Sequence, residues 1–287
     1  MKKGRKVVVF LLALLLLIMG LLHVFQEKII FLPEPINKEY VYQFPFDFEE
    51  VNLKTKDNQT INALHIKAEN PKGIILYFHG NQGNLIRWGE ITSYFTQFKY
   101  DVFVIDYRGY GKSTGVFNET QMYNDALLSY NYVKKQFPED KIIVYGRSLG
   151  TTFATKVASE NKPKHVILEA PFYNLHHAAN FKYKVIPKFL LNFKFTSNEY
   201  ISKIKSPITI FHGTEDKTTP MEGSKQLFKL ISTSKKEFIP LKNGTHHNVR
   251  SFEKYTTTLK KNFRELTYLE MVSLRHNFFV CKLLFKI

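Results

Sequence analysis

Residues 141–150 read KIIVYGRSLG, and this stretch decides the fold. An apolar, strand-forming run leads directly into Gly-x-Ser-x-Gly, and a helix-like stretch follows over 149–160. A serine at a sharp turn from strand to helix has a strained backbone and needs small neighbours two residues before and after it. Gly146 and Gly150 meet that need, so the sequence predicts a nucleophile elbow with Ser148 at its tip.

Similar short apolar runs recur on both sides of this strand. They cover residues 73–80, 101–109, 164–170, 207–213 and 235–241. Runs of this kind are typical of strands buried on both faces. Helix-like stretches separate them, near 84–98, 120–137, 221–231 and 250–264. Alternating strands and helices predict a mostly parallel sheet with helices on both faces.

Two alternating segments precede these runs, at 48–55 and 60–68, on either side of the turn signal Asp57–Asn58. They predict an antiparallel hairpin that joins the sheet. The fold class is therefore α/β, with a mixed, mostly parallel sheet of about eight strands. Residues 172–203 interrupt the alternation with many aromatic side chains and little strand pattern. We expect a small helical lid there, with a crossover helix and a long loop as the alternative.

The N-terminus carries an apolar segment, VVVFLLALLLLIMGLLHVF, over residues 7–25. As a helix its nineteen residues would span about 28 Å, which matches the hydrocarbon thickness of a bilayer. A cleaved signal peptide is the competing interpretation, but no small-x-small site follows Gly20. We expect an uncleaved transmembrane anchor.

A basic flank, residues 1–6, precedes this segment with Lys2, Lys3, Arg5 and Lys6, and only Lys28 follows closely. The positive-inside rule then predicts a cytoplasmic N-terminus with the rest of the chain on the opposite side. Behind the anchor we expect a stalk over 26–46 and one α/β domain over 47–265. The tail over 266–287 is apolar but interrupted by charges, and no role is predicted for it.

The net charge is +16, yet the lysines are spread along the whole chain. Nucleic-acid-binding proteins more often cluster Arg and Lys on one element with interleaved aromatics, so no nucleic-acid partner is predicted. Attraction to an anionic membrane surface fits the charge better. The single cysteine, Cys281, excludes an intrachain disulfide.

Neither a metal nor a cofactor is predicted. His176 and His177 are adjacent and lack the i, i+4 spacing that would bring two imidazoles to one helix face. Gly111-Lys112-Ser113 imitates the end of a phosphate-binding loop, but Asp106 stands where that loop needs its first glycine.

Polar side chains follow two of the later strands. Asp216 comes just after the run 207–213, and His246 and His247 come just after 235–241. Serine needs a base to remove its proton, and an imidazole base needs a carboxylate to hold its tautomer. The chain order Ser, Asp, His is that of an α/β-hydrolase sheet. These residues therefore predict a catalytic triad at the carboxyl ends of the strands.

The loop after the first parallel run reads HGNQGN over 79–84. Its glycines would allow backbone amides to approach a substrate oxygen closely. We expect the amides of Asn81 and Leu149 to form the oxyanion hole, and His79 to be structural.

Six segments together resemble the α/β-hydrolase superfamily, in particular a membrane-anchored branch similar to serine-aminopeptidase-like hydrolases and protein depalmitoylases. They are YFHGNQGN (77–84), DYRGYGKSTG (106–115), GRSLG (146–150), EAPF (169–172), HGTEDKTTP (212–220) and GTHHN (244–248). The resemblance implies Ser148 as nucleophile, Asp216 as acid and His247 as base, because the family's histidine typically precedes an Asn. The doubled histidine leaves His246 as the alternative.

The expected activity is cleavage of carboxylic esters or thioesters with an apolar acyl group, through an acyl-enzyme on Ser148. The aromatic lid and the membrane tether favour a small-molecule or lipid-like acyl substrate. An amidase or peptidase using the same triad is the alternative. Glu169 is a candidate anchor for a charged substrate end, although a structural role under the lid is favoured for it. A non-enzymatic binding module on the same fold is a further alternative. The sequence predicts no oligomeric state.

Overall fold

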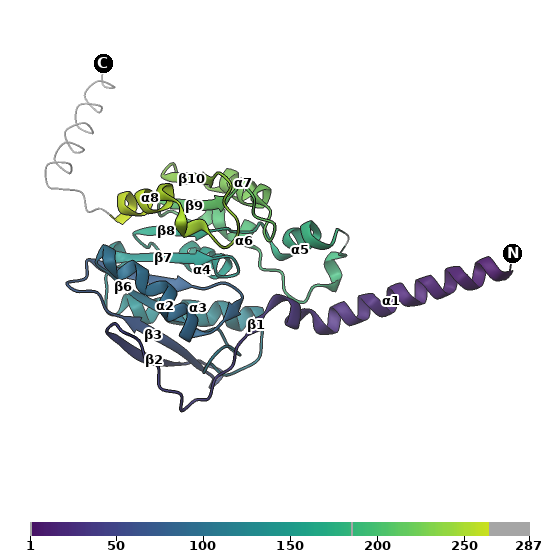
Figure 1. The fold of residues 1–287 in the computed structure, drawn as a ribbon, viewed down its shortest axis with the longest axis horizontal. Helices are drawn as coiled ribbons and strands as arrows, with labels where there is room; N and C mark the ends of the chain where they lie inside the picture. Colours follow the sequence, from purple (N-terminus) through teal and green to yellow (C-terminus); the bar gives the residue numbers. More distant parts are fainter. Residues whose placement is uncertain (1, 185, 264–287) are drawn as a thin grey trace, which may run out of the picture.

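The computed structural model describes residues 2–184 and 186–263. At its centre lies an eight-stranded sheet in the order β10-β9-β8-β7-β4-β6-β3-β2 (Figure 1). The predicted tail over 266–287 lies outside the described residues.

The hairpin at one edge of the sheet consists of β2 (Phe48–Lys54) and β3 (Thr60–Ile66). These strands pair antiparallel, and β3 pairs antiparallel with β6 (Tyr100–Ile105). Asn58 in the connecting turn has a φ of 60°, a conformation that asparagine tolerates better than most residues. The predicted hairpin is confirmed.

The remaining strands pair parallel with their neighbours. They are β4 (Gly73–Phe78), β7 (Ile142–Arg147), β8 (His165–Glu169), β9 (Ile208–Gly213) and β10 (Lys236–Leu241). Every residue of β4, β7 and β9 is buried, as continuous apolar strands require. The predicted α/β-hydrolase fold with a mostly parallel sheet is confirmed.

Two hydrophobic clusters lie on opposite faces of the sheet, because successive side chains of a strand point to opposite sides. In β4, Leu76 packs into one cluster and the neighbouring Ile75 and Tyr77 into the other. The first cluster is covered by α3 (Glu119–Lys134), α4 (Gly150–Glu160) and α7 (Met221–Leu230). The second is covered by α2 (Leu85–Ser93) and α8 (Glu253–Phe263).

Between β8 and β9, the described residues of the predicted lid segment 172–203 form short helices and no strand. They are α5 (Leu175–Tyr183), η3 (Lys188–Leu190), α6 (Ser197–Tyr200) and η4 (Ile201–Lys203). Asn174 caps α5, since its side chain accepts a hydrogen bond from the amide of His177.

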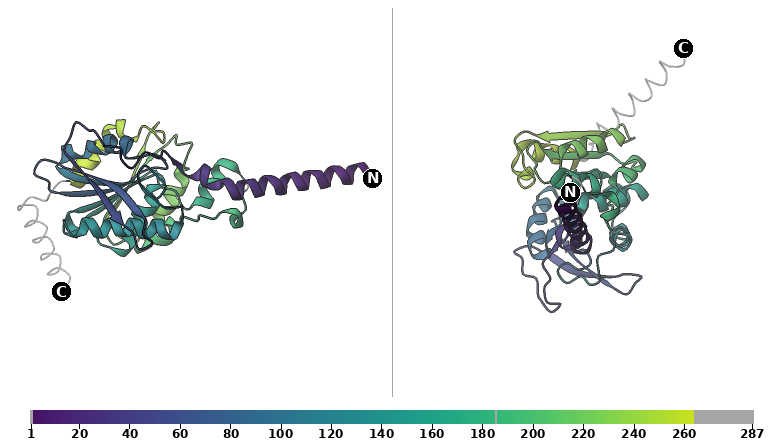
Figure 2. Two further views of the ribbon diagram at one scale, coloured as in Figure 1. Left: turned by 90° about the horizontal axis from the view of Figure 1, so that it is seen from below. Right: turned by 90° about the vertical axis from the view of Figure 1, so that its right-hand side faces the viewer.

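The N-terminal helix α1 (Lys2–Ile30) projects away from the domain, at the end where α5 lies (Figures 1 and 2). Its apolar part is long enough to cross a membrane. The helix does not end at Phe25 but continues to Ile30, so the stalk expected from residue 26 begins later. Gln, Glu and Lys at 26–28 are good helix formers, and Gln26 is buried against the lid segment.

The chain leaving α1 is held against the domain at once. Strand β1 (Leu32–Pro33) pairs in parallel with β5 (Gln82–Gly83), a two-stranded sheet that sequence reasoning missed. The ring of Phe31 is buried and stacks on Phe117 with ring centroids 4.2 Å apart. Helix α1 and the domain are therefore joined by a packed, hydrogen-bonded segment.

Candidate active site

Ser148 lies at the sharp turn between β7 and α4. Its φ of 51° places a non-glycine residue in the left-handed region, which is the strain expected at a nucleophile elbow. The amide of Ser148 donates to the Glu169 carbonyl at 2.9 Å. A Cβ on Gly146 would collide with Ala154 and the Gly150 carbonyl, and one on Gly150 with the Phe78 carbonyl. The elbow therefore requires glycine at both positions.

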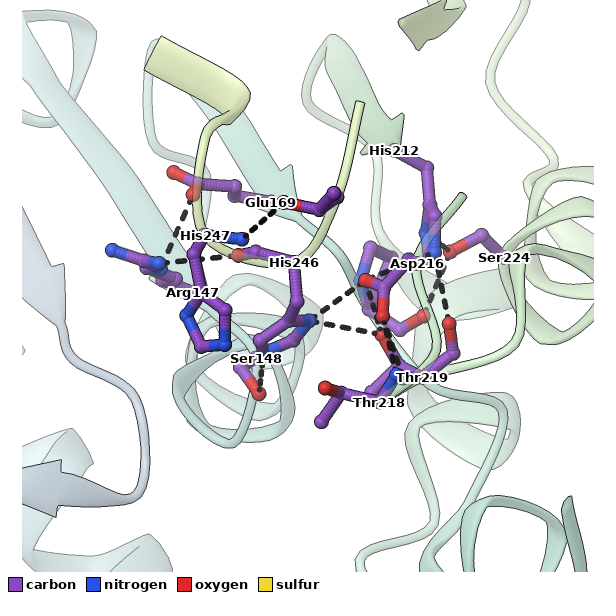
Figure 3. Close-up of polar contacts among 12 residues, drawn as sticks. Arg147, Ser148, Glu169, His212, Asp216, Thr218, Thr219, Ser224, His246 and His247 are labelled. Carbon is purple, nitrogen blue, oxygen red and sulfur yellow. Dashed lines mark hydrogen bonds and ion pairs between the residues drawn. The ribbon is translucent and has the colours of Figure 1, made fainter. Parts of the chain in front are cut away.

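His246 lies between the hydroxyl of Ser148 and the carboxylate of Asp216 (Figure 3). The distance from its Nε2 to the Ser148 Oγ is 3.0 Å, and from its Nδ1 to the Asp216 Oδ2 it is 2.7 Å. If the Nδ1 proton is donated to the carboxylate, Nε2 is left free to accept the serine proton. All three side chains are buried or nearly so.

His247 was the preferred base on the sequence, and the geometry corrects this preference in favour of the alternative, His246. The His247 ring makes no hydrogen bond to Ser148 or Asp216 among the described residues; it packs edge-on against His246 at 5.3 Å. The Asn248 side chain accepts from the Thr245 amide at 2.7 Å and fixes this turn. In the family the catalytic histidine typically precedes an asparagine. That pattern does not tell which of two adjacent histidines the turn directs toward the serine.

Asp216 is held in its orientation by four hydrogen bonds. Its Oδ1 accepts from the amides of Thr218 and Thr219 at 2.8 and 2.9 Å. Its Oδ2 accepts from the Thr219 hydroxyl at 3.0 Å and from His246. Burial alone would raise the pKa of Asp216, but the hydrogen bond and charge of His246 and the Thr219 amide outweigh it, and the pKa lies below its ordinary value. The carboxylate is thus ionised and able to orient the imidazole.

The two predicted oxyanion donors, Asn81 and Leu149, line the same cavity as Ser148. Among the described residues neither backbone amide has a hydrogen-bond acceptor, which leaves both available to a substrate oxygen. Leu149 caps the N-terminus of α4, where the helix dipole favours negative charge. The Asn81 loop is fixed from outside: its carbonyl accepts from the Leu32 amide at 2.9 Å, and its side chain donates to the Ile30 carbonyl at 2.9 Å.

Arg147 was missed on the sequence. Its Nη2 donates to the carbonyl of His246 at 3.2 Å, and its Nε lies 3.2 Å from the Glu169 Oε1. The Tyr145 hydroxyl donates to the other oxygen of Glu169 at 2.5 Å. A positively charged residue inside the Gly-x-Ser-x-Gly motif, followed by an acidic residue at the end of the next strand, was the available signal.

Glu169, once a candidate anchor for a charged substrate end, is 1% exposed. Because its carboxylate is occupied by Arg147 and Tyr145, it supports the loop that carries His246. It is not placed to receive a substrate.

Several other histidines of the described residues have partners within the protein. His79 is buried, stacks on Trp88 and has its Nδ1 2.6 Å from the Gly80 carbonyl. His212 is buried between Ser224 and the Thr219 carbonyl, and burial lowers its pKa. His176 and His177 lie on α5. Within residues 2–184 and 186–263, no group of three or more acidic, His or Cys side chains could hold a metal ion.

A cavity of about 190 Å³ opens at Ser148. Apart from the site residues, mainly aliphatic side chains line it, among them Leu175, Ala178 and Leu190. It can accommodate an apolar group next to the serine hydroxyl.

Comparisons with known proteins agree with this geometry. The family model described as Serine aminopeptidase, S33 matches residues 69–199. An uncharacterized protein of Acanthamoeba polyphaga mimivirus is 30% identical over 84% of this chain and 86% of its own length. The lysophosphatidylserine lipase ABHD12 of Danio rerio is 31% identical over 60% of this chain, which spans 52% of that protein.

Among solved structures, an esterase from Pyrococcus furiosus superposes with a TM-score of 0.66 at 18% identity, over 81% of this chain and 96% of the esterase. At that identity the likeness is one of fold. With the elbow, the strand order and the relatives that cover most of its length, the chain belongs to the α/β-hydrolase superfamily.

Proposed function

We propose that this protein is a membrane-anchored serine hydrolase that cleaves carboxylic esters or thioesters of an apolar acyl group. The observation that carries the proposal is the placement of the His246 ring between the Ser148 hydroxyl and the Asp216 carboxylate, at 3.0 and 2.7 Å. Three side chains from separate turns meet in the geometry that acyl transfer needs.

In the proposed mechanism, the Ser148 Oγ attacks the acyl carbonyl carbon while His246 Nε2 takes its proton. The carbonyl oxygen becomes an oxyanion, which accepts hydrogen bonds from the amides of Asn81 and Leu149. When the intermediate collapses, the bond to the leaving oxygen or sulfur breaks and His246 returns the proton to that atom. Water, deprotonated by His246, then hydrolyses the acyl-enzyme in the same way.

The substrate class follows from the cavity beside Ser148. Its mainly aliphatic lining favours a hydrocarbon chain over a charged peptide. The similarity to a lysophosphatidylserine lipase and the apolar helix α1 support a lipid-like ester. Because Glu169 is buried and paired, the amidase alternative loses its candidate anchor.

The membrane location is part of the proposal. Residues 7–25 would span the bilayer with the basic flank 1–6 in the cytoplasm and the hydrolase domain on the opposite side. The site then works at the surface of the outer leaflet.

Labelling with a fluorophosphonate probe tests the activity. We expect the full-length protein to be labelled and Ser148→Ala to be unlabelled, because only an activated serine reacts with the probe. The matched control is Ser159→Ala, a partly exposed serine near the end of α4, which should be labelled like the wild type. Equal labelling of Ser148→Ala and wild type would reject the proposal, as would no labelling of either.

A further inference from the structure

The C-terminal turns of α1 face the candidate active site. Leu22, Gln26, Ile29 and Ile30 line the same cavity as Ser148. Residues of the lid segment line the same cavity, namely Leu175, Ala178, Ala179, Ile186, Leu190 and Leu191. A helix that sequence analysis assigns to anchoring alone therefore supplies part of the apolar surface beside the nucleophile.

The contact between helix and lid segment is specific. Gln26 is 5% exposed, and its side chain donates to the Leu190 carbonyl at 3.1 Å and accepts from the Asn192 amide at 2.8 Å. His23 Nδ1 lies 2.9 Å from the same Leu190 carbonyl. Since a buried amide costs stability unless its hydrogen bonds are made, these bonds fix the position of α1 against the lid segment.

The cavity reaches the depth of the acyl chains. Leu22 belongs to the apolar segment 7–25, and at 1.5 Å per residue it would lie roughly 4–5 Å inside the hydrocarbon edge. The lid segment beside it exposes Phe181, Tyr183 and Phe189. Aromatic rings are typical of the bilayer interface. Lysines that follow these rings in sequence, Lys182 and Lys184, suit an anionic lipid surface.

We propose that the last turns of α1 form one side of the acyl-chain pocket, so that the enzyme takes the chain of a membrane amphiphile directly from the leaflet in which α1 ends. This inference rests on the proposed hydrolase function and adds the source of the substrate. The helix then acts as anchor and as binding surface.

Chain-length selectivity tests the pocket. The measurement is the ratio of kcat/KM for p-nitrophenyl palmitate to kcat/KM for p-nitrophenyl acetate, in full-length protein reconstituted in phosphatidylcholine vesicles. Ile29→Trp should lower this ratio by about tenfold or more, because the indole occupies space that only the long chain uses. Ala179→Leu, in the part of the cavity that the lid segment lines, should lower the ratio as well.

The matched control is Val24→Trp, which lies on the same helix, is 68% exposed and does not line the cavity. It should leave the ratio at the wild-type value. An unchanged ratio in both Ile29→Trp and Ala179→Leu would overturn the inference, as would an equal change in Val24→Trp.

Surface dilution tests the route of entry. At constant bulk concentration, diluting the palmitate ester twofold with inert phosphatidylcholine should halve the rate when the ester is subsaturating, whereas acetate hydrolysis should not change. A palmitate rate that follows bulk concentration alone would contradict entry from the leaflet. Absence of both acetate hydrolysis and fluorophosphonate labelling would instead reject the hydrolase function itself.

Discussion

At the scale of single residues, the adjacent imidazoles 246 and 247 have the same chemistry and differ in direction. Only His246 lies within hydrogen-bond distance of Ser148 and Asp216. The sequence could place the base within this pair, but choosing between them required the turn geometry set by Asn248 and Arg147. Serine and aspartate, each unique in its motif, needed no such information to be proposed.

Substituting the two histidines separately tests the assignment. His246→Ala should lower kcat for p-nitrophenyl acetate by about 10⁴-fold or more, since base and tautomer control vanish together. His247→Ala should keep kcat within about threefold of the wild-type value. That limit corresponds to a change of less than about 1 kcal/mol in the activation free energy. Steady-state rates on full-length protein are the measurement, and the reverse pattern would restore His247 as base.

The pH dependence of the rate is set by the proposed base, His246, and its carboxylate partner, Asp216. The pKa of Asp216 lies below its ordinary value, so this carboxylate remains ionised well into the acid range and loses its contribution only as pH falls through the lowered pKa. The acid fall in kcat/KM should therefore come from loss of the proposed base and not from loss of the carboxylate. A rate measured from pH 4 to 9 that stays flat on the acid side would contradict a histidine base.

Arg147 is a positioning residue rather than a catalytic one. Arg147→Met removes the hydrogen bond to the His246 carbonyl and leaves the buried Glu169 without the Arg147 guanidinium as its ion-pair partner. We expect kcat to fall by about 10- to 100-fold with KM little changed, because the imidazole is displaced and the cavity is not. Arg147→Lys keeps the charge and should recover part of the loss. A change confined to thermal stability, with kcat unaltered, would argue against positioning.

At the scale of elements, the sequence pattern located every strand of the main sheet, through continuous apolar runs and, for the hairpin, through alternation. For example, the run 73–80 became β4 and the run 207–213 became β9. Continuous apolar runs are informative because a strand buried on both faces tolerates little else. Composition could not reveal β1 and β5, since two residues each pair only because tertiary packing brings them together. The helix α1 continues beyond the apolar segment to Ile30, because the polar residues 26–28 are good helix formers.

At the scale of the whole molecule, the proposed anchor would place the proposed hydrolase domain on one side of the membrane. Sealed cells treated with a membrane-impermeant fluorophosphonate should show Ser148-dependent labelling without permeabilisation, as the basic flank predicts. Ser148→Ala provides the background. Labelling that requires permeabilisation would place the domain in the cytoplasm and reverse the topology.

The hydrogen bonds from the Asn81 loop to Ile30 and Leu32 have a mechanical consequence. A flexible tether would let a reaction centre wander over tens of ångströms, but here the loop that carries one proposed oxyanion donor is joined to the point where the helix emerges. In the proposed membrane location, the height of Ser148 above the bilayer is thereby fixed. A thicker or thinner membrane that tilts α1 would therefore also shift the Asn81 amide, the proposed hydrogen-bond donor to the oxyanion.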